Sequence, residues 1–205
     1  MSLPPLIRPL DYLRIRHPRK RNYDGWLPLS LTVGSIVVLF FLPVPIRIFG
    51  NGGLLDILAG LLQVLIGFYI AALAAVATFD RPGMDQPMAG DSPELWVTRH
   101  GVTESQKLTR RRFLSLMFGY LALLSFLLYG VSAFGNLFEP NIHALIPYES
   151  KGFIFARWGF LSIFLFLAFN LLVTTMLGLY YMTDRIHRFE GSTIIKSRQE
   201  EDIEE

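Results

Sequence analysis

Residues 54–79 read LLDILAGLLQVLIGFYIAALAAVATF, an almost uninterrupted apolar run. As an α-helix rising 1.5 Å per residue, this run would be about 39 Å long. The hydrocarbon core of a bilayer is only about 30 Å thick. The run therefore predicts a transmembrane helix that tilts or protrudes from the membrane.

Three further apolar runs accompany it, at residues 29–46, 113–135 and 158–182. Pro43 and Pro45 predict that the helix of the first run ends or kinks there. Charged residues make up only 18% of the chain, well below the quarter that soluble domains carry. We therefore predict an all-α integral membrane bundle of four transmembrane helices. The first run lacks a small-x-small cleavage site and is interpreted as a retained span.

The polar segments between these runs divide the chain into five parts. They are a basic N-terminal segment 1–28, a transmembrane hairpin 29–79, a loop 80–112, a second transmembrane hairpin 113–182 containing an external loop 136–157, and an acidic tail 183–205. In the 80–112 loop, Ser92-Pro93-Glu94 and Thr103-x-x-Gln106 predict short helices, the second continuous with the third span. Pro140 and Pro147 argue against a long helix in the external loop. Gly50-Asn51-Gly52-Gly53 predicts a tight turn.

The charge distribution predicts the orientation. Of the 19 Lys and Arg residues, 16 lie in the N-terminal segment, the 80–112 loop and the tail, and only Arg47, Lys151 and Arg157 lie on the opposite side. The positive-inside rule then puts both termini in the cytoplasm. A short, cysteine-free chain of four uncleaved spans favours a bacterial inner membrane.

Small residues recur along the second span. Gly67, Ala71 and Ala75 are spaced by four, which places them on one helix face where another backbone can approach closely. This face is predicted to pack either within the bundle of one chain or against a second copy in a homo-oligomer. The spacing alone does not separate the two interpretations.

Two amide side chains lie inside the spans, Gln63 in the second and Asn170 in the fourth. We expect each to hydrogen-bond another helix, at about 0.6–1 kcal/mol apiece. The alternative is a polar path that these amides share with Thr174 and Thr175, as in a pore-forming or small transport subunit. A carrier is expected to show more buried charge and broken helices in matching halves.

Basic clusters border two spans, and the chain ends in acidic residues. The clusters either fix topology and attract anionic lipid or dock an acidic cytosolic partner, and the tail is either solvated or seats a basic partner. The candidate partner-binding residues are Arg19, Lys20, Arg21, Arg110, Arg111, Arg112, Glu200, Glu201 and Asp202. No sequence-specific nucleic-acid module fits the 33 loop residues, so direct reading of nucleic acid is not expected.

No motif for catalysis or cofactor binding is present in the sequence. G-x-S-x-G, H-E-x-x-H and P-loop patterns are all missing. The four histidines lie in separate segments without metal-ligand spacing; they are His17, His100, His143 and His187. We therefore predict a protein that is not an enzyme and has no metal or cofactor.

The chain length, the four-span layout and the basic lead-in DYLRIRHPRKRNYDGW at residues 11–26 resemble the membrane subunit of Kiwa-type anti-phage defence systems. The resemblance implies a homo-oligomer that senses infection at the membrane and recruits a DNA-binding cytosolic effector. Together with the lack of catalytic motifs, it leads us to predict a non-enzymatic membrane sensor or scaffold.

Overall fold

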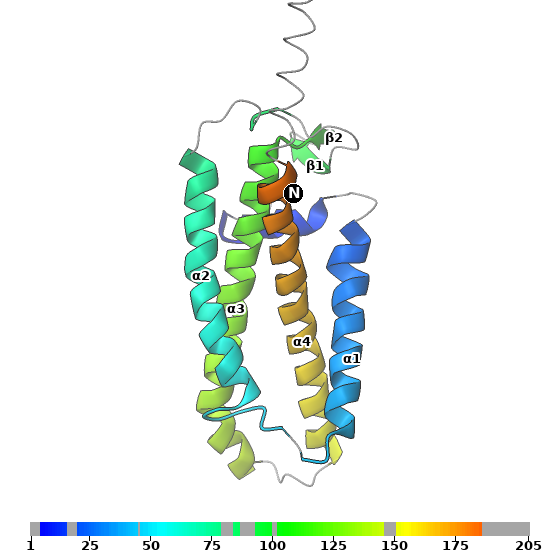
Figure 1. Cartoon of the computed structure of the whole chain (residues 1–205), viewed down its shortest axis with the longest axis vertical. Coiled ribbons are helices and arrows are strands. Elements are labelled where there is room, and N and C mark those ends of the chain that lie inside the picture. Colours follow the sequence, from blue (N-terminus) through cyan, green and yellow to red (C-terminus); the bar gives the residue numbers. More distant parts are fainter. Residues whose placement is uncertain are drawn as a thin grey trace, which may run out of the picture.

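The computed structural model describes residues 5–15, 20–44, 46–78, 84–86, 93–99, 102–145 and 151–185. Four long helices run up and down beside one another (Figure 1). They are α1 (Leu27–Phe41), α2 (Leu54–Thr78), α3 (Arg110–Leu145) and α4 (Lys151–Tyr180). Short helical segments precede α1 and follow α4, namely η1 (Pro5–Arg14), η2 (Asn22–Trp26) and η3 (Tyr181–Arg185).

Four helices in the described part of the chain are long and apolar enough to cross a membrane. They span Asn22–Phe41, Leu54–Thr78, Arg110–Asn141 and Gly152–Thr183. The predicted all-α class with four candidate spans is thereby confirmed, and the protein is a membrane protein. The second span matches its predicted limits almost residue for residue.

The two ends of the bundle differ in construction. One end holds the starts of α1 and α3, the ends of α2 and α4, and a two-stranded antiparallel hairpin of β1 (Glu94–Arg99) and β2 (Val102–Lys107). We call this the hairpin end. The opposite end, here the far end, holds the connection between α1 and α2. Within the basic N-terminal segment, η1 lies across the bundle near the start of α1 (Figure 1).

The core follows from side chains at regular helical spacing. α2 packs on α3, α3 packs on α4, and α4 packs on α1. The face of α2 that meets α3 is a heptad seam, formed by Leu55, Leu62, Tyr69 and Val76, all buried. At the α3–α4 contact, a Cβ added to Gly178 would lie 2.7 Å from Met117 Cε, so a larger residue there would displace the flexible end of the Met117 side chain.

The structure corrects the predicted loop 80–112. Residues that were expected to form short helices form the hairpin instead, with Glu94 opposite Lys107 and Arg99 opposite Val102. The physical reason is that Trp96, Val97 and Thr98 belong to the aromatic and β-branched types that favour strands. The predicted cap at Ser92 lies outside the described residues.

The predicted external loop 136–157 is also wrong in most of its length. α3 continues through Pro140 to Leu145, and α4 begins at Lys151. A proline inside a helix removes one N–H donor and its ring crowds the carbonyl four residues earlier, but membrane helices tolerate both changes because neighbouring groups and local adjustments satisfy the freed backbone. Pro147 lies outside the described residues, as does the tail from residue 186 onward.

The connection between α1 and α2 agrees with its prediction. α1 ends at Phe41, and Leu42 is extended directly before Pro43, because a residue that precedes proline disfavours the helical region. Gly50 and Gly52 have φ values of 82° and 72°, which glycine adopts without steric cost. The Gly53 amide donates to the Gly50 carbonyl at 3.0 Å and closes the tight turn.

Candidate functional site

A cluster of polar side chains lies inside the bundle toward its hairpin end. Polar groups within membrane spans are costly and are functional-site candidates by default. The polar cluster comprises Tyr12 from η1, Lys20 and Asp24 from the η2 region, Tyr120 from α3 and Asn170 from α4. It therefore joins the basic N-terminal segment to two membrane helices.

Asn170 is the centre of this cluster. Its Oδ1 accepts a hydrogen bond from the Tyr120 hydroxyl at 2.8 Å, and its Nδ2 donates to the backbone carbonyl of Asp24 at 2.8 Å. One buried amide thus connects α4 to both α3 and η2. The expectation that Asn170 bonds another helix is confirmed.

Tyr12 attaches η1 to the bundle. Its side chain is only 1% exposed and stacks on the Tyr120 ring, with centroids 5.0 Å apart and planes at 22°. Its hydroxyl donates to Asp24 Oδ1 at 3.4 Å. Burial, reinforced by the negative charge of Asp24, raises the pKa of Tyr12, so the phenol stays neutral and keeps its donor.

The sequence of η1 explains why this segment docks with that face inward. Ile15 is buried like Tyr12, whereas Arg8 and Arg14 are exposed. One face of the segment is therefore apolar, and the exposed side carries Arg8 and Arg14 beside Ile7 and Leu13, as in helices that lie at a membrane interface. The apolar face covers α3, and the arginines remain accessible.

Lys20 makes three contacts within the polar cluster. Its ammonium lies 3.3 Å from Asp24 Oδ2, donates to the backbone carbonyl of Tyr12, and sits 4.3 Å from the centre of the Tyr12 ring. Burial lowers the pKa of Lys20, and the Asp24 carboxylate opposes that shift. These contacts pair the Lys20 charge within the chain, and partner binding by Lys20 stays a prediction.

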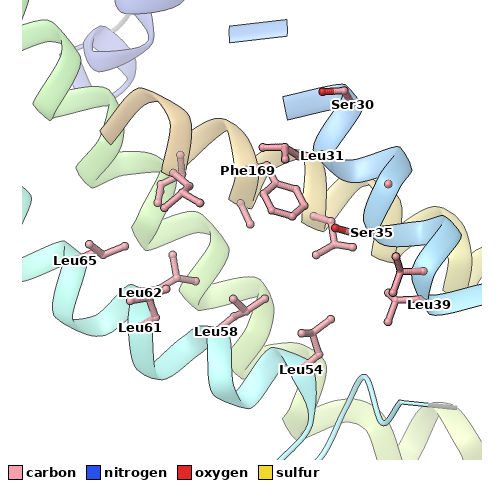
Figure 2. Close-up of a pocket in the computed structure, with 16 residues that line it drawn as sticks. Ser30, Leu31, Ser35, Leu39, Leu54, Leu58, Leu61, Leu62, Leu65 and Phe169 are labelled. Carbon is pink, nitrogen blue, oxygen red and sulfur yellow. The ribbon is translucent and has the colours of Figure 1, made fainter. Parts of the chain in front are cut away.

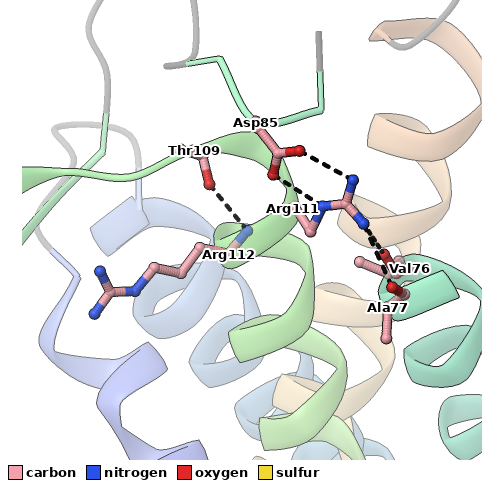
Figure 3. A network of polar contacts seen from close by, with 6 residues as sticks. All are labelled: Val76, Ala77, Asp85, Thr109, Arg111 and Arg112. Carbon is pink, nitrogen blue, oxygen red and sulfur yellow. Dashed lines mark hydrogen bonds and ion pairs between the residues drawn. The ribbon is translucent and has the colours of Figure 1, made fainter. Parts of the chain in front are cut away.

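Arg111 forms a second polar contact at the hairpin end (Figure 3). Its Nε and Nη2 donate to the two carboxylate oxygens of Asp85 at 2.9 and 3.0 Å. Its Nη1 reaches the carbonyls of Val76 and Ala77, each at 3.4 Å. A cation at the last turn of α2 is favourable because it meets unpaired carbonyls and the negative end of the helix dipole. Arg111 therefore links the start of α3 to the end of α2 and to Asp85, and its predicted partner contact stays a prediction.

The remaining predicted partner residues have different environments. Arg21 and Arg112 are exposed, Arg112 donates to Gln106 Oε1 at 2.8 Å, and Arg110 is half-buried. Arg19, Glu200, Glu201 and Asp202 lie outside the described residues.

Sequence reasoning missed three members of the polar cluster, namely Tyr12, Asp24 and Tyr120. The available signal was a tyrosine and an aspartate flanking the basic run in 11–26, together with a tyrosine inside a span.

The small-residue face of α2 points away from the rest of the chain. We call this the α2 outward face; it comprises Gly60, Gln63, Gly67, Ala71 and Ala74, all exposed. A Cβ added to Gly60 or Gly67 would meet nothing within 4 Å. The interpretation that Gly67 and Ala71 pack within one bundle is therefore not supported, and Ala75 is half-buried.

Gln63 differs from the polar residues with which it was predicted to share a path. Its side chain is exposed on the α2 outward face, and the described part of the chain offers it no hydrogen bond. Thr174 and Thr175 are buried, and the Thr175 hydroxyl is hydrogen-bonded to Tyr69 at 2.5 Å. The structure thus does not bring Gln63 together with Asn170 and the two threonines.

Among the residues that the structure describes, no three His, Cys, Asp or Glu side chains gather as metal ligands. Comparison with known proteins finds no matching family model, no matching curated protein and no matching solved structure.

Proposed function

We propose that this protein is a non-enzymatic membrane sensor or scaffold that self-associates and presents its basic N-terminal segment to a cytosolic partner. The observation that carries the proposal is the hydrogen-bonded connection from Tyr120 through Asn170 to Asp24. This connection fixes the basic segment to the helices that cross the membrane.

The connection gives a physical route from the membrane to the partner-binding surface. A shift of α3 against α4 would break the Tyr120–Asn170 bond and disturb the stacked ring of Tyr12. We infer a second arrangement in which these contacts are broken, and a signal that favours one arrangement over the other would be transmitted through them. The arginines on η1 and η2 would then change position relative to the bundle.

Charge supports placing the hairpin end in the cytoplasm. The exposed basic residues there include Arg8, Arg14, Arg21, Lys107 and Arg112. The far end carries Arg47 and Arg157, and one Arg157 amine donates to the Ile46 carbonyl at 3.4 Å. The positive-inside rule therefore favours a cytoplasmic hairpin end, and we propose a bacterial inner membrane as the site of action.

The α2 outward face supports self-association. Gln63 lies within the apolar stretch of α2 and is exposed, so in a monomer its amide would face hydrocarbon. Membrane helices gain about 0.6–1.7 kcal/mol when such a group bonds a neighbouring helix. Gly60 and Gly67 flank Gln63 and would let a second α2 approach closely. Two copies related by a two-fold axis could pair their Gln63 amides with each other.

The resemblance to Kiwa-type membrane subunits supplies a biological setting for this proposal. In that setting the partner would be a DNA-binding effector and the signal would be infection by a phage. The proposed self-association and the basic surface are compatible with such a role. The acidic tail would be a second contact for the effector.

Co-purification tests the proposal. The tagged full chain is expressed with its neighbouring genes, extracted in mild detergent and analysed by light scattering and mass spectrometry. We expect a soluble protein to co-elute with an oligomer of this chain. Replacing Arg8, Arg21 and Arg112 by Gln should release that protein, whereas Arg47→Gln at the far end should retain it. Retention by the triple variant, or the lack of any soluble partner, would contradict the proposed recruitment.

A further inference from the structure

An apolar groove of about 620 Å³ lies between α1, α2 and α4 (Figure 2). It exists because α1 packs on α4 while α2 packs on α3, which leaves space between α1 and α2. All of its lining residues belong to three of the four candidate spans. The groove is therefore at membrane depth.

The lining is suited to hydrocarbon. Leu58, Leu61 and Leu65 line it from α2, Phe169 from α4, and Gly34 from α1. The hydroxyl of Ser30, which also lines the groove, already donates to the Leu27 carbonyl at 2.9 Å. Close helix–helix contacts in membranes favour small residues and hydrogen-bonding groups on the facing surfaces. The α2 wall, which is made of leucines, offers neither, and the small residues Ser30, Gly34 and Ser35 are confined to the α1 wall.

The length of the groove suits extended hydrocarbon chains. The groove follows α2 from Leu54 to Leu65, about 16 Å at 1.5 Å per residue. Extended hydrocarbon chains are much thinner than a helix and can fill such a space.

We propose that this groove binds the acyl chains of a bilayer phospholipid and that the bound lipid bridges α1 and α2. An unfilled groove would deprive its lining side chains of dispersion contacts on one side, and lipid tails are the hydrocarbon available at that depth. The site requires a membrane location and does not depend on the proposed scaffold role. If the scaffold role holds, the groove is where lipid composition could change the spacing of α1 and α2.

Photolabelling in nanodiscs tests this site. The full chain is placed in phosphatidylethanolamine and phosphatidylglycerol doped with a phosphatidylethanolamine that carries a diazirine on its acyl chain. We expect adducts, mapped by mass spectrometry, to concentrate on the α1 and α2 walls of the groove. They should exceed those on Val33 and Phe41, which are exposed on α1. An even distribution over exposed residues would show annular lipid only and overturn the proposal.

A matched pair of glycine substitutions sharpens the test. A Cβ added to Gly34 or to Gly159 meets nothing within 4 Å, so neither change creates a backbone clash. Gly34→Phe places a ring in the groove and should reduce its labelling several-fold. Gly159→Phe adds the same ring at an exposed position of α4 that does not line the groove and should leave labelling unchanged. Equal labelling in both variants would contradict the proposal, and the wild-type distribution stands as a test even if Gly34→Phe fails to fold.

A second copy of the chain as occupant would give a different result. The chain contains no cysteine, so Ser35→Cys introduces a single thiol into the groove. Under the lipid proposal, oxidation in nanodiscs yields no disulfide-linked dimer through this position. Dimers that form at Ser35→Cys, together with weak lipid labelling, would assign the groove to a helix of another copy.

Discussion

Asn170 and Gln63 are both amides within membrane spans, yet their surroundings are opposite. Asn170 is buried on α4 and bonds both Tyr120 and the Asp24 carbonyl. Gln63 is exposed on α2 between two glycines whose surroundings are open. The same functional group completes the fold of one chain in the first region and is available to another chain in the second.

This difference suggests separate roles for the two regions in the proposed scaffold: one fixes structure within the chain, and the other is available for association. The polar cluster around Asn170 sets the position of the basic N-terminal segment. The α2 outward face around Gln63 has no such internal task, because the opposite face of α2 already packs on α3 through a heptad seam. A substitution in the first region should change stability, and one in the second should change association.

The largest expected effect is on the stability of the chain itself. Asn170→Leu would leave the Tyr120 hydroxyl without its acceptor and the Asp24 carbonyl without its donor. Leaving a buried polar group unsatisfied costs about 1–3 kcal/mol. Gln63→Leu, which removes an amide of similar size but no bond within the chain, should change monomer stability by less than about 0.5 kcal/mol. Denaturant unfolding in bicelles of both variants measures the contrast, and equal losses would remove the distinction between the two regions.

The next effect is on association. Gln63→Leu should weaken self-association by about 0.6–1.7 kcal/mol, the range of hydrogen bonds between membrane helices. Energy transfer between labelled copies, titrated against lipid dilution, gives the dissociation constant. Asn170→Leu serves as the comparison, because it should affect unfolding more than association among the folded molecules. An unchanged dissociation constant for Gln63→Leu would show that its amide lies outside the interface.

A smaller effect concerns the response of η1 to alkaline pH. A free phenol titrates near pH 10, and burial raises the pKa of docked Tyr12. The neutral phenol thus stabilises docking below about pH 10, and this contribution is lost as the pH rises further. The contribution of Lys20 to docking changes with pH in the opposite direction. Burial lowers the pKa of Lys20, so its buried ammonium destabilises docking at lower pH, and this destabilisation is relieved as the pH approaches 10.4. The two effects partly cancel.

A fluorescent probe can report this release. Leu13 is exposed on η1, and the chain has no cysteine, so Leu13→Cys accepts a single label. We expect the probe to detect undocking above about pH 10 in the parent protein. Tyr12→Phe has no phenol to ionise, so the part of the alkaline undocking that is caused by Tyr12 should disappear. Identical alkaline transitions in both proteins would show that the Tyr12 phenol does not control docking.

The smallest expected effect is at the Arg111–Asp85 pair. The Asp85 side chain is 69% exposed, and exposed ion pairs contribute about 0–1 kcal/mol because water and salt screen them. Asp85→Asn should therefore lower stability only slightly, and the change should shrink in high salt. Thermal unfolding at two salt concentrations measures it. A loss as large as that of Asn170→Leu would mean that the hairpin end depends on this pair as strongly as on the polar cluster.

The membrane helices could be predicted from the sequence because their signal is local. The run at 54–79 is apolar throughout, and α2 occupies Leu54–Thr78. The hairpin could not be predicted in the same way, since Thr103 is compatible both with a helix cap and with a strand. Pro140 was likewise given too much weight, because one missing donor does not end α3.

The polar cluster could not be predicted from the sequence for a different reason. Lys20 and Arg21 are neighbours in one basic run, yet Lys20 is paired with Asp24 and Arg21 is exposed. Which of the two turns inward depends on the docking of Tyr12 against Tyr120 on α3. That contact joins residues far apart in the sequence, and no local pattern encodes it. Asn170 could be predicted as a hydrogen-bonding residue, but its partners could not.

The most direct test of the account is the mass of the complex after substitution on the α2 outward face. Light scattering of the protein in mild detergent compares the wild type with Gly67→Leu and with Gly130→Leu, a matched change on α3 where an added Cβ also meets nothing within 4 Å. We predict a defined oligomer for the wild type and Gly130→Leu, and a smaller species for Gly67→Leu. A monomeric wild type, or a Gly67→Leu variant of unchanged mass, would contradict the claim that α2 joins the copies.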